Sequence, residues 1–290
     1  MALYSPERDP YKPRRLAILG DLRRAIESDQ LFLEFQPRID LANGRLLGAE
    51  ALVRWHHPVL GTLPPVEFIP LAEQTGLMRP LTRWVLGATL RQLRAWEEAG
   101  LIASVSANVS ARNLHDPRFP EEVEGLLATW GTPPERLVLE ITESAILQNE
   151  RRSAESLKHL RSLGLELALD DFGTGYSSLT HLRRLPFSEI KIDQSFVKEI
   201  ATRADDAAIV RATSHLGHSL GIRVAAEGVE DALSLDCLRS IGCDLAQGYY
   251  LGRPADAASL SSRLPRAAST GEAGAPAPSA VPHAPPLRAH

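Results

Sequence analysis

The chain has 290 residues, of which 44% are hydrophobic and 23% charged, and its formal net charge is −4. This composition excludes collagenous, coiled-coil and wholly disordered chains, and the mild negative charge argues against a partner such as a nucleic-acid polymer, which selects strongly basic surfaces. No apolar run approaches the roughly 18 residues that a membrane-spanning helix needs. Two cysteines, Cys237 and Cys243, do not make a disulfide framework and indicate a cytoplasmic location.

The two ends of the chain differ in composition from its centre. Residues 1–15 are polar and interrupted by prolines, so we expect a linker or leader there. Residues 263–290 are rich in alanine and proline and nearly lack large apolar side chains. Because such a segment cannot bury enough surface to offset the entropy of ordering, we expect a disordered tail. One domain is expected between them, over residues 16–262.

Within this central region, short runs rich in leucine or β-branched residues alternate with longer segments of helical period. In chain order the expected elements are strands Leu31–Gln36 and Leu46–Val53, helix Pro80–Ala99, strand Ser104–Val109, helix Glu121–Thr129, strand Leu137–Ile141, helix Arg151–Leu163, strands Leu165–Leu169 and Glu189–Ile192, helix Asp205–Leu220, strand Arg223–Ala226, helix Ala232–Ile241 and strand Asp244–Gln247. A glycine follows each helix, where a left-handed residue commonly ends helices: Gly100, Gly131, Gly164, Gly221 and Gly242.

The order of these elements favours one fold class. Strands with helices between most of them, over about 250 residues, predict an α/β protein built as a closed (β/α)8 barrel of the TIM type. The alternative is an open, doubly wound sheet. That fold would call for a glycine-rich phosphate-binding turn after an early strand, and the sequence contains none.

Polar side chains lie inside or directly after the predicted strands. In a parallel barrel the carboxyl ends of all strands meet on one face, where active sites form. We therefore expect these side chains to share one pocket: Glu50, Asn108, Glu140, Asp170, Asp171, Lys191, Glu227 and Gln247. Any one of them alone would more often be a strand-end cap or a solvated charge.

As a set, these residues indicate a metal site. Carboxylates crowded around a single lysine would repel one another and raise one another's pKa values, and divalent cations commonly relieve this repulsion. Carboxylate and amide oxygens are hard ligands that suit Mg²⁺ or Mn²⁺ better than zinc. The adjacent pair Asp170 and Asp171 is well placed to bridge two ions, as in phosphate-ester hydrolysis.

Several motifs then resemble a known family. The string Glu50-Ala51-Leu52-Val53-Arg54 matches an E-A-L-x-R signature, and the chain resembles the EAL-domain cyclic-di-GMP phosphodiesterases of bacteria. The resemblance runs from about Leu16 to Leu260 and implies a TIM-like barrel with a modified first strand. Its further motifs are Phe35–Pro37, Phe68–Gly76, Asn108–Ser110, Glu140–Glu143, Asp170–Leu179, Lys191–Asp193, Ala226–Glu230 and Gln247–Pro254. Together, in this order, they are far more specific than any one of them.

The resemblance assigns roles to individual positions. It implies two bound ions, Mg²⁺ or Mn²⁺, the first held by Glu50, Asn108, Glu140 and Asp170 and the second by Asp170 and Asp171. Three residues receive catalytic roles: Lys191 at the attacking water, Glu227 as general base or outer ligand of the second metal, and Glu143. Three others receive substrate-binding roles: Gln36 toward the dinucleotide, Arg54 toward a phosphate, and Gln247, which would position water or metal.

Glu143 also bears on assembly. It resembles the glutamate that anchors the loop after the fifth expected strand, here Phe172–Leu179, which in the family couples the metal site to a dimer interface. The resemblance therefore implies a homodimer. The alternative is an ordinary glycine turn beside a solvated glutamate.

The chemistry implied is hydrolysis of one phosphodiester bond of cyclic di-GMP, which gives linear pGpG and lowers this bacterial second messenger. Family members that have lost site residues act instead as catalytically silent cyclic-di-GMP receptors or as protein-interaction modules, and both remain alternatives. This sequence departs from the family at none of the positions above. The first residues (ALYSPERD) resemble the linker that leaves a GGDEF domain, so the chain is either a fragment with an upstream GGDEF or sensory domain or a free-standing protein.

Overall fold

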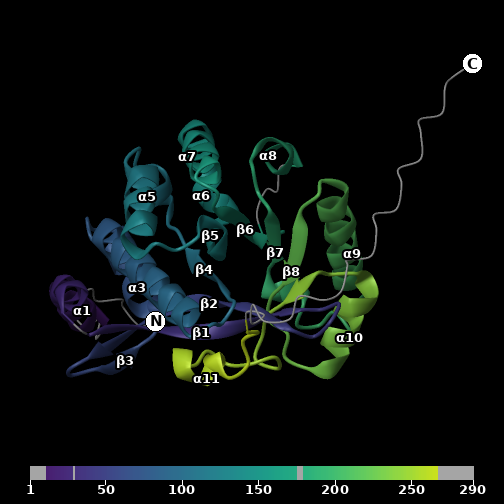
Figure 1. Ribbon diagram of the computed structural model, residues 1–290, viewed down its shortest axis with the longest axis horizontal. Coiled ribbons are helices and arrows are strands. Elements are labelled where there is room, and N and C mark those ends of the chain that lie inside the picture. Colours follow the sequence, from purple (N-terminus) through teal and green to yellow (C-terminus); the bar gives the residue numbers. More distant parts are fainter. Residues whose placement is uncertain (1–10, 29, 175–178, 267–290) are drawn as a thin grey trace, which may run out of the picture.

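The strands of the chain close into a barrel (Figure 1). The computed structural model describes residues 11–28, 30–174 and 179–266. Around the barrel the strands follow the order β1-β9-β8-β7-β6-β5-β4-β2, and β2 pairs with β1 to close it. These strands are β1 (Leu31–Asp40), β2 (Leu46–His57), β4 (Ser104–Asn108), β5 (Leu137–Thr142), β6 (Glu166–Phe172), β7 (Glu189–Ile192), β8 (Arg223–Ala226) and β9 (Leu245–Ala246).

The first strand distinguishes this barrel from a regular (β/α)8 barrel. β1 runs antiparallel to both of its neighbours, β2 and β9, whereas the pairs from β2 through β4 to β9 are parallel. β1 and β2 form a hairpin in which Gln36 lies opposite Glu50 and Arg38 opposite Gly48. A short strand, β3 (Gly61–Leu63), pairs antiparallel with the last residues of β2. The predicted barrel with a modified first strand is confirmed.

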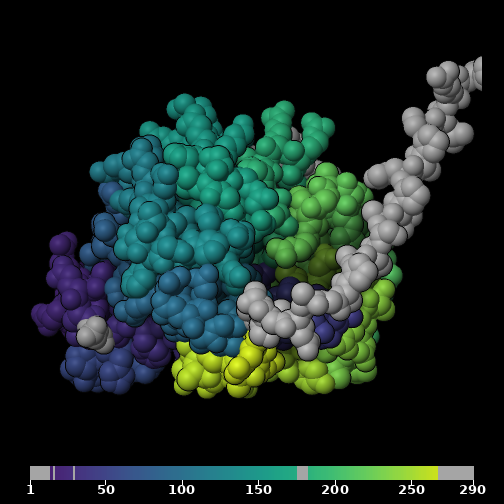
Figure 2. All heavy atoms as spheres, viewed as in Figure 1, coloured from purple at the N-terminus to yellow at the C-terminus, as the bar shows by residue number. Residues whose placement is uncertain are grey.

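Helices cover the outside of the barrel, with α3, α5 and α7 on one side and α9 and α10 on the other (Figure 1). In the space-filling view of Figure 2, the teal middle of the chain lies above the blue and yellow segments that come from nearer its two ends. The helices are α1 (Tyr11–Glu27), α2 (Pro65–Glu73), α3 (Met78–Glu98), α4 (Ala111–Leu114), α5 (Phe119–Trp130), α6 (Glu143–Leu147), α7 (Glu150–Ser162), α8 (Leu179–Arg184), α9 (Ala204–Ser219), α10 (Ala232–Ile241) and α11 (Ala257–Ser261). Two 3-10 turns cover Pro134–Arg136 and Gln194–Phe196.

The hydrophobic core lies mainly between the barrel and these helices. Helix α3 buries a stripe of apolar side chains that includes Leu81, Leu86 and Leu90 at helical spacing. On the other side, Val210 of α9 and Leu238 of α10 are buried in a cluster with Val224 of β8. The outward-facing side chains of the strands thus supply the apolar contacts, and this leaves the inside of the barrel available for polar groups.

The expected helix ends are confirmed. All five glycines expected after the helices have positive φ angles, between 62° at Gly131 and 94° at Gly164. The short elements β3, α2, α4, α6, α8 and α11 lie in stretches that the periodicity had left unassigned. Among the described residues, no helix is both long and apolar enough to cross a membrane.

The structure differs from the expectation at both edges of the domain. Helix α1 begins at Tyr11, inside the expected linker, because its apolar positions, including Ile18 and Leu22, are buried against the rest of the fold and its proline lies in the first turn. At the other edge, Leu264 is buried and Pro265 accepts a hydrogen bond from the backbone of Ile102, so residues 263–266 are ordered rather than part of the tail. Residues 1–10 and 267–290 lie outside the described part of the chain.

Candidate active site

The polar residues expected at the strand ends do converge at the carboxyl end of the barrel. Glu50, Glu140, Asp170 and Lys191 lie on β2, β5, β6 and β7, and Glu227 directly follows β8. Two of them have a small neighbour on one adjacent strand: Ser106 lies opposite Glu50 on β4, and Ala225 lies opposite Lys191 on β8. Because these neighbours are small, the long charged side chains can extend across the interior of the barrel.

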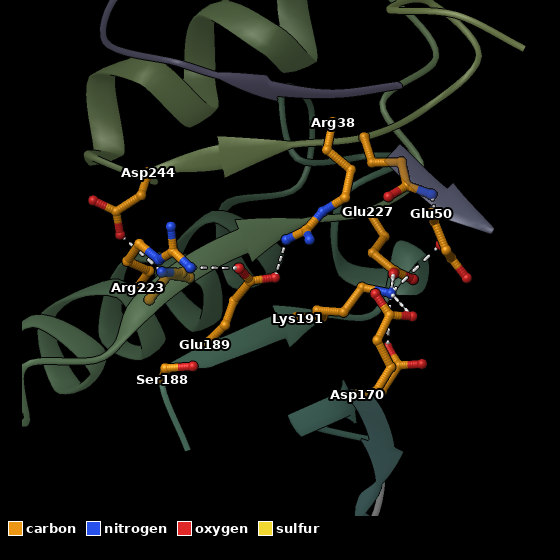
Figure 3. Close-up of polar contacts among 12 residues, drawn as sticks. Arg38, Glu50, Asp170, Ser188, Glu189, Lys191, Arg223, Glu227 and Asp244 are labelled. Atoms are coloured by element: carbon orange, nitrogen blue, oxygen red, sulfur yellow. Dashed lines mark hydrogen bonds and ion pairs between the residues drawn. The ribbon is translucent and has the colours of Figure 1, made fainter. Parts of the chain in front are cut away.

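Lys191 is the centre of this cluster (Figure 3). Its side chain is 2% exposed, and its Nζ lies 2.5 Å from Glu227 Oε1 and 2.7 Å from Glu140 Oε2. Asp170 Oδ1 at 3.4 Å and Glu50 Oε2 at 3.6 Å complete the surroundings of the ammonium. Four carboxylates from four different strand ends thus face one buried cation.

Amide side chains hold Glu50 in place. Asn108 Nδ2 donates to Glu50 Oε1 at 2.8 Å, and Gln247 Nε2 donates to Glu50 Oε2 at 2.6 Å. Gln247 Nε2 also lies 2.9 Å from Gln36 Oε1, and Gln36 Nε2 donates to the backbone carbonyl of Gly252. The structure therefore joins Gln36, Asn108 and Gln247 to the carboxylate cluster through hydrogen bonds.

The environment shifts the pKa values of these groups in opposite directions. Burial alone would raise the pKa of Glu50, but Lys191 and the two amide donors outweigh it and lower that pKa. Burial and the charge of Glu50 raise the pKa of Glu140 well above its usual range, and Lys191 only partly opposes them. Burial likewise raises the pKa of Glu227 to about 7. Burial would lower the pKa of Lys191, but the surrounding carboxylates, first Asp170 and Glu140, raise it, so this lysine stays charged.

Asp171 has a strained backbone next to Asp170. Its φ angle is 56°, in the left-handed region that residues other than glycine rarely adopt. The conformation lets the Asp171 N–H donate to Asp170 Oδ1 at 3.0 Å, and its carbonyl accepts a hydrogen bond from the Thr174 hydroxyl. Burial and the neighbouring Asp170 charge raise the pKa of the half-buried Asp171 carboxyl. The two aspartates are thereby held as one unit at the end of β6.

Two further expected site residues, Arg54 and Glu143, lie on β2 and α6. Arg54, near the end of β2, donates from Nε to Glu34 Oε2 at 2.8 Å and from Nη1 to the carbonyl of Val53. Glu143 is buried in the first turn of α6, directly after the strand that carries Glu140. Of the loop Phe172–Leu179, residues 175–178 lie outside the described residues, so the structure does not test the expected link from Glu143 to a dimer interface.

A pocket of about 300 Å³ opens beside the cluster. Tyr249 lies at this pocket about half exposed, and the guanidinium of Arg253 lies over its ring at 4.5 Å from the ring centre. Carboxylates, amides and one further lysine line the rest: Gln36, Glu50, Asp170, Gln194, Lys198, Glu227, Glu230 and Gln247. The pocket gives a ligand access to the carboxylates from the carboxyl end of the barrel.

Comparison with known proteins identifies this arrangement. The sequence matches the EAL domain family over residues 19–254, most of the chain. The protein belongs to the EAL domain family. MucR, described as a bifunctional diguanylate cyclase/cyclic di-GMP phosphodiesterase from Pseudomonas aeruginosa, is 42% identical over 247 residues, which are 85% of this chain and 36% of MucR. The cyclic di-GMP phosphodiesterase PA2567 of the same organism is 41% identical over 87% of this chain and 43% of its own.

Solved structures of EAL domains share the fold. A structure of the PaMucR phosphodiesterase in complex with c-di-GMP superposes with a TM-score of 0.81 and 42% sequence identity, and the match covers 84% of this chain and 99% of that one. The chain spans only about a third to two fifths of the length of MucR and PA2567. The comparison therefore concerns the EAL domain rather than those whole proteins.

The side chains of this EAL domain suit a divalent cation by their chemistry. The set expected to hold metal, Glu50, Asn108, Glu140, Asp170 and Asp171, consists of hard oxygen donors. Glu140 Oε1 is buried and has no hydrogen-bond partner among the described residues, so it can accept a cation. Within the described part of the chain, no group of three acidic, histidine or cysteine side chains is arranged to hold a metal ion. The carboxylates of the cluster contact the ammonium of Lys191. In this arrangement the ammonium of Lys191 supplies the positive charge that a bound metal ion would otherwise supply.

One buried pair in the interior of this EAL domain was not expected from the sequence. Arg38 on β1 and Glu189 on β7 form an ion pair inside the barrel, 4% and 0% exposed. The sequence did contain a signal, because Arg38 follows Gln36 by two residues and Glu189 precedes Lys191 by two. Side chains two residues apart on a strand point to the same face, so residues next to site residues at this spacing point into the barrel.

Proposed function

We propose that this EAL domain hydrolyses one phosphodiester bond of cyclic di-GMP and releases linear pGpG, with Mg²⁺ or Mn²⁺ as cofactor. The observation that carries the proposal is the convergence of four carboxylates on the buried ammonium of Lys191 at the carboxyl end of the barrel. Two further observations support it: relatives over 40% identical are described as cyclic di-GMP phosphodiesterases, and one solved relative holds c-di-GMP.

The cation would be held by the oxygen atoms of Glu50, Asn108, Glu140, Asp170 and Asp171. When bound, divalent cations supply positive charge that polarises the phosphoryl group and stabilises the attacking and leaving oxygens. The strained backbone of Asp171 supports this assignment, because it places two carboxylates next to each other despite their repulsion. Strain of this kind is concentrated at functional sites.

Lys191 would stabilise the negative charge that develops on the phosphoryl oxygens. Its pKa is raised well above its usual range, so it carries a full positive charge at every physiological pH. The ammonium is buried and held by carboxylates on several sides, so its position is fixed before the substrate arrives. A charge placed in advance in this way contributes more than one that must reorganise during the reaction.

Glu227 would accept the proton of the attacking water. Its pKa of about 7 lies close to the pH of the cell, and general bases work best when their pKa matches the working pH. Glu227 also lines the pocket beside the cluster, where a water molecule and the phosphate can reach it. Its contact with Lys191 Nζ at 2.5 Å fixes the orientation of the carboxylate.

Three residues would bind the dinucleotide. Gln36 and Gln247 line the pocket and offer amide groups to the substrate or to bound water. The guanidinium of Arg54 has further N–H groups beyond those that contact Glu34 and Val53, and its planar shape suits a phosphate. We also propose a homodimer formed through the loop after β6, as well as an upstream GGDEF or sensory domain. The length of the relatives, which exceeds that of this chain, supports the second of these proposals.

Incubation of the purified protein with cyclic di-GMP and Mg²⁺ or Mn²⁺, followed by chromatography of the nucleotides, tests the function. We expect pGpG to accumulate, and we expect excess chelator to stop its formation. A receptor would bind cyclic di-GMP without forming pGpG, and a protein-interaction module would do neither. Either of those results would overturn the proposed function.

A further inference from the structure

The interior of the barrel contains a second charged layer below the site. Arg38 and Glu189 are ion-paired and almost completely buried, and Figure 3 shows them next to Lys191 and its carboxylates. The interior of such barrels is usually filled by branched apolar residues. Placing two charged side chains there instead costs desolvation energy, so we looked for a function that the Arg38–Glu189 pair could serve.

The pair forms the floor of the site. Arg38 and Glu189 also line a pocket of about 270 Å³ at the opposite end of the barrel, among the first residues of the strands. There, Nη2 of Arg223 lies 3.6 Å from Glu189 Oε2, but the Arg223 side chain is 48% exposed, so solvent screens its charge. The side chain of Arg38 is only 5% exposed, so solvent screens its charge much less. Its charge is therefore neutralised mainly by Glu189.

The charge of Arg38 acts on the site above it. Burial would lower the pKa of Arg38, but Glu189, followed by Glu140 and Glu50, raises it. The interaction is reciprocal, because Arg38 lowers the pKa values of Glu140 and Glu50. An arginine in a protein does not lose its proton. Any change in how Glu189 neutralises Arg38 will therefore change the electrostatic potential at the carboxylates around Lys191.

We propose that Glu189 is a positioning residue that neutralises Arg38 and so keeps the barrel floor from repelling the divalent cations that the site takes up. The inference rests on the proposed metal-dependent function. Without Glu189, the carboxylates would face two buried cations, Lys191 and an Arg38 that has lost its ion-pair partner. A unit charge added inside a protein changes the interaction with a dication substantially, since the effective dielectric constant there is far below that of water.

Titration calorimetry of the metal-free protein with Mn²⁺ tests this inference. Glu189→Gln keeps the size of the side chain and an oxygen that accepts from Arg38, but removes the charge. We expect it to weaken Mn²⁺ binding by about tenfold or more. The double variant Arg38→Met with Glu189→Gln restores neutrality, so we expect its affinity to return to within about threefold of the wild type. Glu155→Gln, which removes a carboxylate from the exposed Arg151–Glu155 pair on α7, is the control and should leave the affinity unchanged.

If the Arg38–Glu189 pair is purely structural, we expect the opposite order of Mn²⁺ affinities. The double variant loses the whole contact and would then bind Mn²⁺ at least as weakly as Glu189→Gln, and that result would overturn the inference. If Glu189→Gln does not fold, Arg38→Met decides the question alone. Since removing the arginine adds no positive charge, its Mn²⁺ affinity should equal or exceed that of the wild type, and a weaker affinity would overturn the inference.

The two proposals fail in different ways. The order of Mn²⁺ affinities among these variants decides the role of Glu189, whether or not the wild type is active. The formation of pGpG by the wild type decides the proposed function. A wild-type protein that binds no Mn²⁺ would overturn both.

Discussion

Lys191 is a buried cation whose carboxylate neighbours come from four separate strands. Removing one partner of a buried ion pair normally destabilises a protein, because the other charge is left without compensation. Here the ammonium has several partners, so the loss of one carboxylate leaves Lys191 paired. The loss of Lys191, in contrast, removes the shared cationic partner of all four carboxylates at once. Lys191 is therefore the residue whose substitution should have the largest effect on chemistry.

Lys191→Ala should lower kcat by about 10²–10⁴-fold in saturating Mn²⁺, on the order of 3–5 kcal/mol of transition-state stabilisation. KM should change much less, because Gln36 and Arg54 remain to bind the substrate. Lys191→Arg should not restore kcat, since the wide, planar guanidinium cannot replace a compact ammonium between carboxylates. Steady-state kinetics with cyclic di-GMP measures both constants. A variant that keeps kcat and only raises KM would make Lys191 a ground-state phosphate clamp.

Glu227 makes the stability of the metal-free protein depend on pH. Its pKa rises from the usual 4.5 to about 7 on folding, so the folded state favours the protonated carboxyl. This contribution to stability is complete below about pH 4.5 and is lost as the pH rises through about 7. Relative to Glu227→Gln, the wild type should therefore lose on the order of 3 kcal/mol of unfolding free energy between these limits.

Urea denaturation of the two chelator-treated proteins at about pH 4.5 and pH 8 measures this difference. The comparison with Glu227→Gln cancels the titration of groups that both proteins share. Parallel pH profiles for the two proteins would show that Glu227 is already ionised at the lower pH, and its assignment as a base with a pKa near 7 would then be wrong.

At the scale of elements, the sequence predicted strands well because most barrel strands are short apolar runs with a polar site residue inside or directly after them. Strands β7 and β8 and helix α10 have the expected bounds. β1 and β2 extend beyond the predicted ends because antiparallel pairing continues, with β9 at Asp40 and with β3 up to His57, a tertiary effect that local periodicity does not contain. β3 is only three residues long and depends on its pairing with β2, so no periodicity could indicate it.

The site residues were predictable for a related reason, whereas Arg38 and Glu189 are indicated only by their spacing of two residues from Gln36 and Lys191. Glu50, Asp170 and Lys191 interrupt apolar runs near strand ends, a position typical of active sites in barrels. Arg38 and Glu189 lie lower in the barrel, among the first residues of the neighbouring strands, where a charged side chain is not the usual mark of an active site. Because the interior of this barrel is polar, the usual relation between charge and exposure is inverted there.

The loop after β9 illustrates how an element positions a site residue. Gly248 directly follows Gln247, and a Cβ at Gly248 would lie 2.2 Å from the backbone N and O of Val229. Val229 donates to the carbonyl of Gln247 and accepts from the N–H of Tyr250. This close approach of two backbones keeps the Gln247 amide in contact with Glu50.

Gly248→Ala should therefore lower the unfolding free energy by about 2–4 kcal/mol and reduce the rate of pGpG formation, because it separates the two backbones. Gly87→Ala is the matched control. Gly87 lies inside helix α3, and a Cβ added there would meet no neighbouring atom within 4 Å, so alanine should raise stability by about 0.5–1 kcal/mol and leave activity unchanged. Urea denaturation and the pGpG assay distinguish the two variants. Equal stability of both would contradict the close-packing account.

For the whole molecule, the apolar outer face of the barrel supplies most of the stability, whereas its polar interior contains the proposed active site. The contacts between strands and helices supply the hydrophobic stabilisation, whereas burial and the charge of Glu50 disfavour the ionised form of Glu140 in the folded state. The pKa of Glu140 is therefore raised well above the usual range. A ligand that binds the folded state and relieves this repulsion should stabilise the entire domain.

Mn²⁺ should accordingly raise the Tm of the chelator-treated protein by about 5–10 °C when the free ion exceeds its Kd about a hundredfold, which corresponds to about 3 kcal/mol. Glu140→Gln should be at least as stable as the wild type without metal, because it removes a destabilised charge, yet should gain much less from Mn²⁺. Differential scanning calorimetry at matched ionic strength measures both effects, since added NaCl accounts for general screening. Two results would contradict cation binding at this cluster: NaCl raises the Tm as much as Mn²⁺ does, or Mn²⁺ raises the Tm of Glu140→Gln as much as that of the wild type. Lys191 would then be the cation that neutralises the carboxylates.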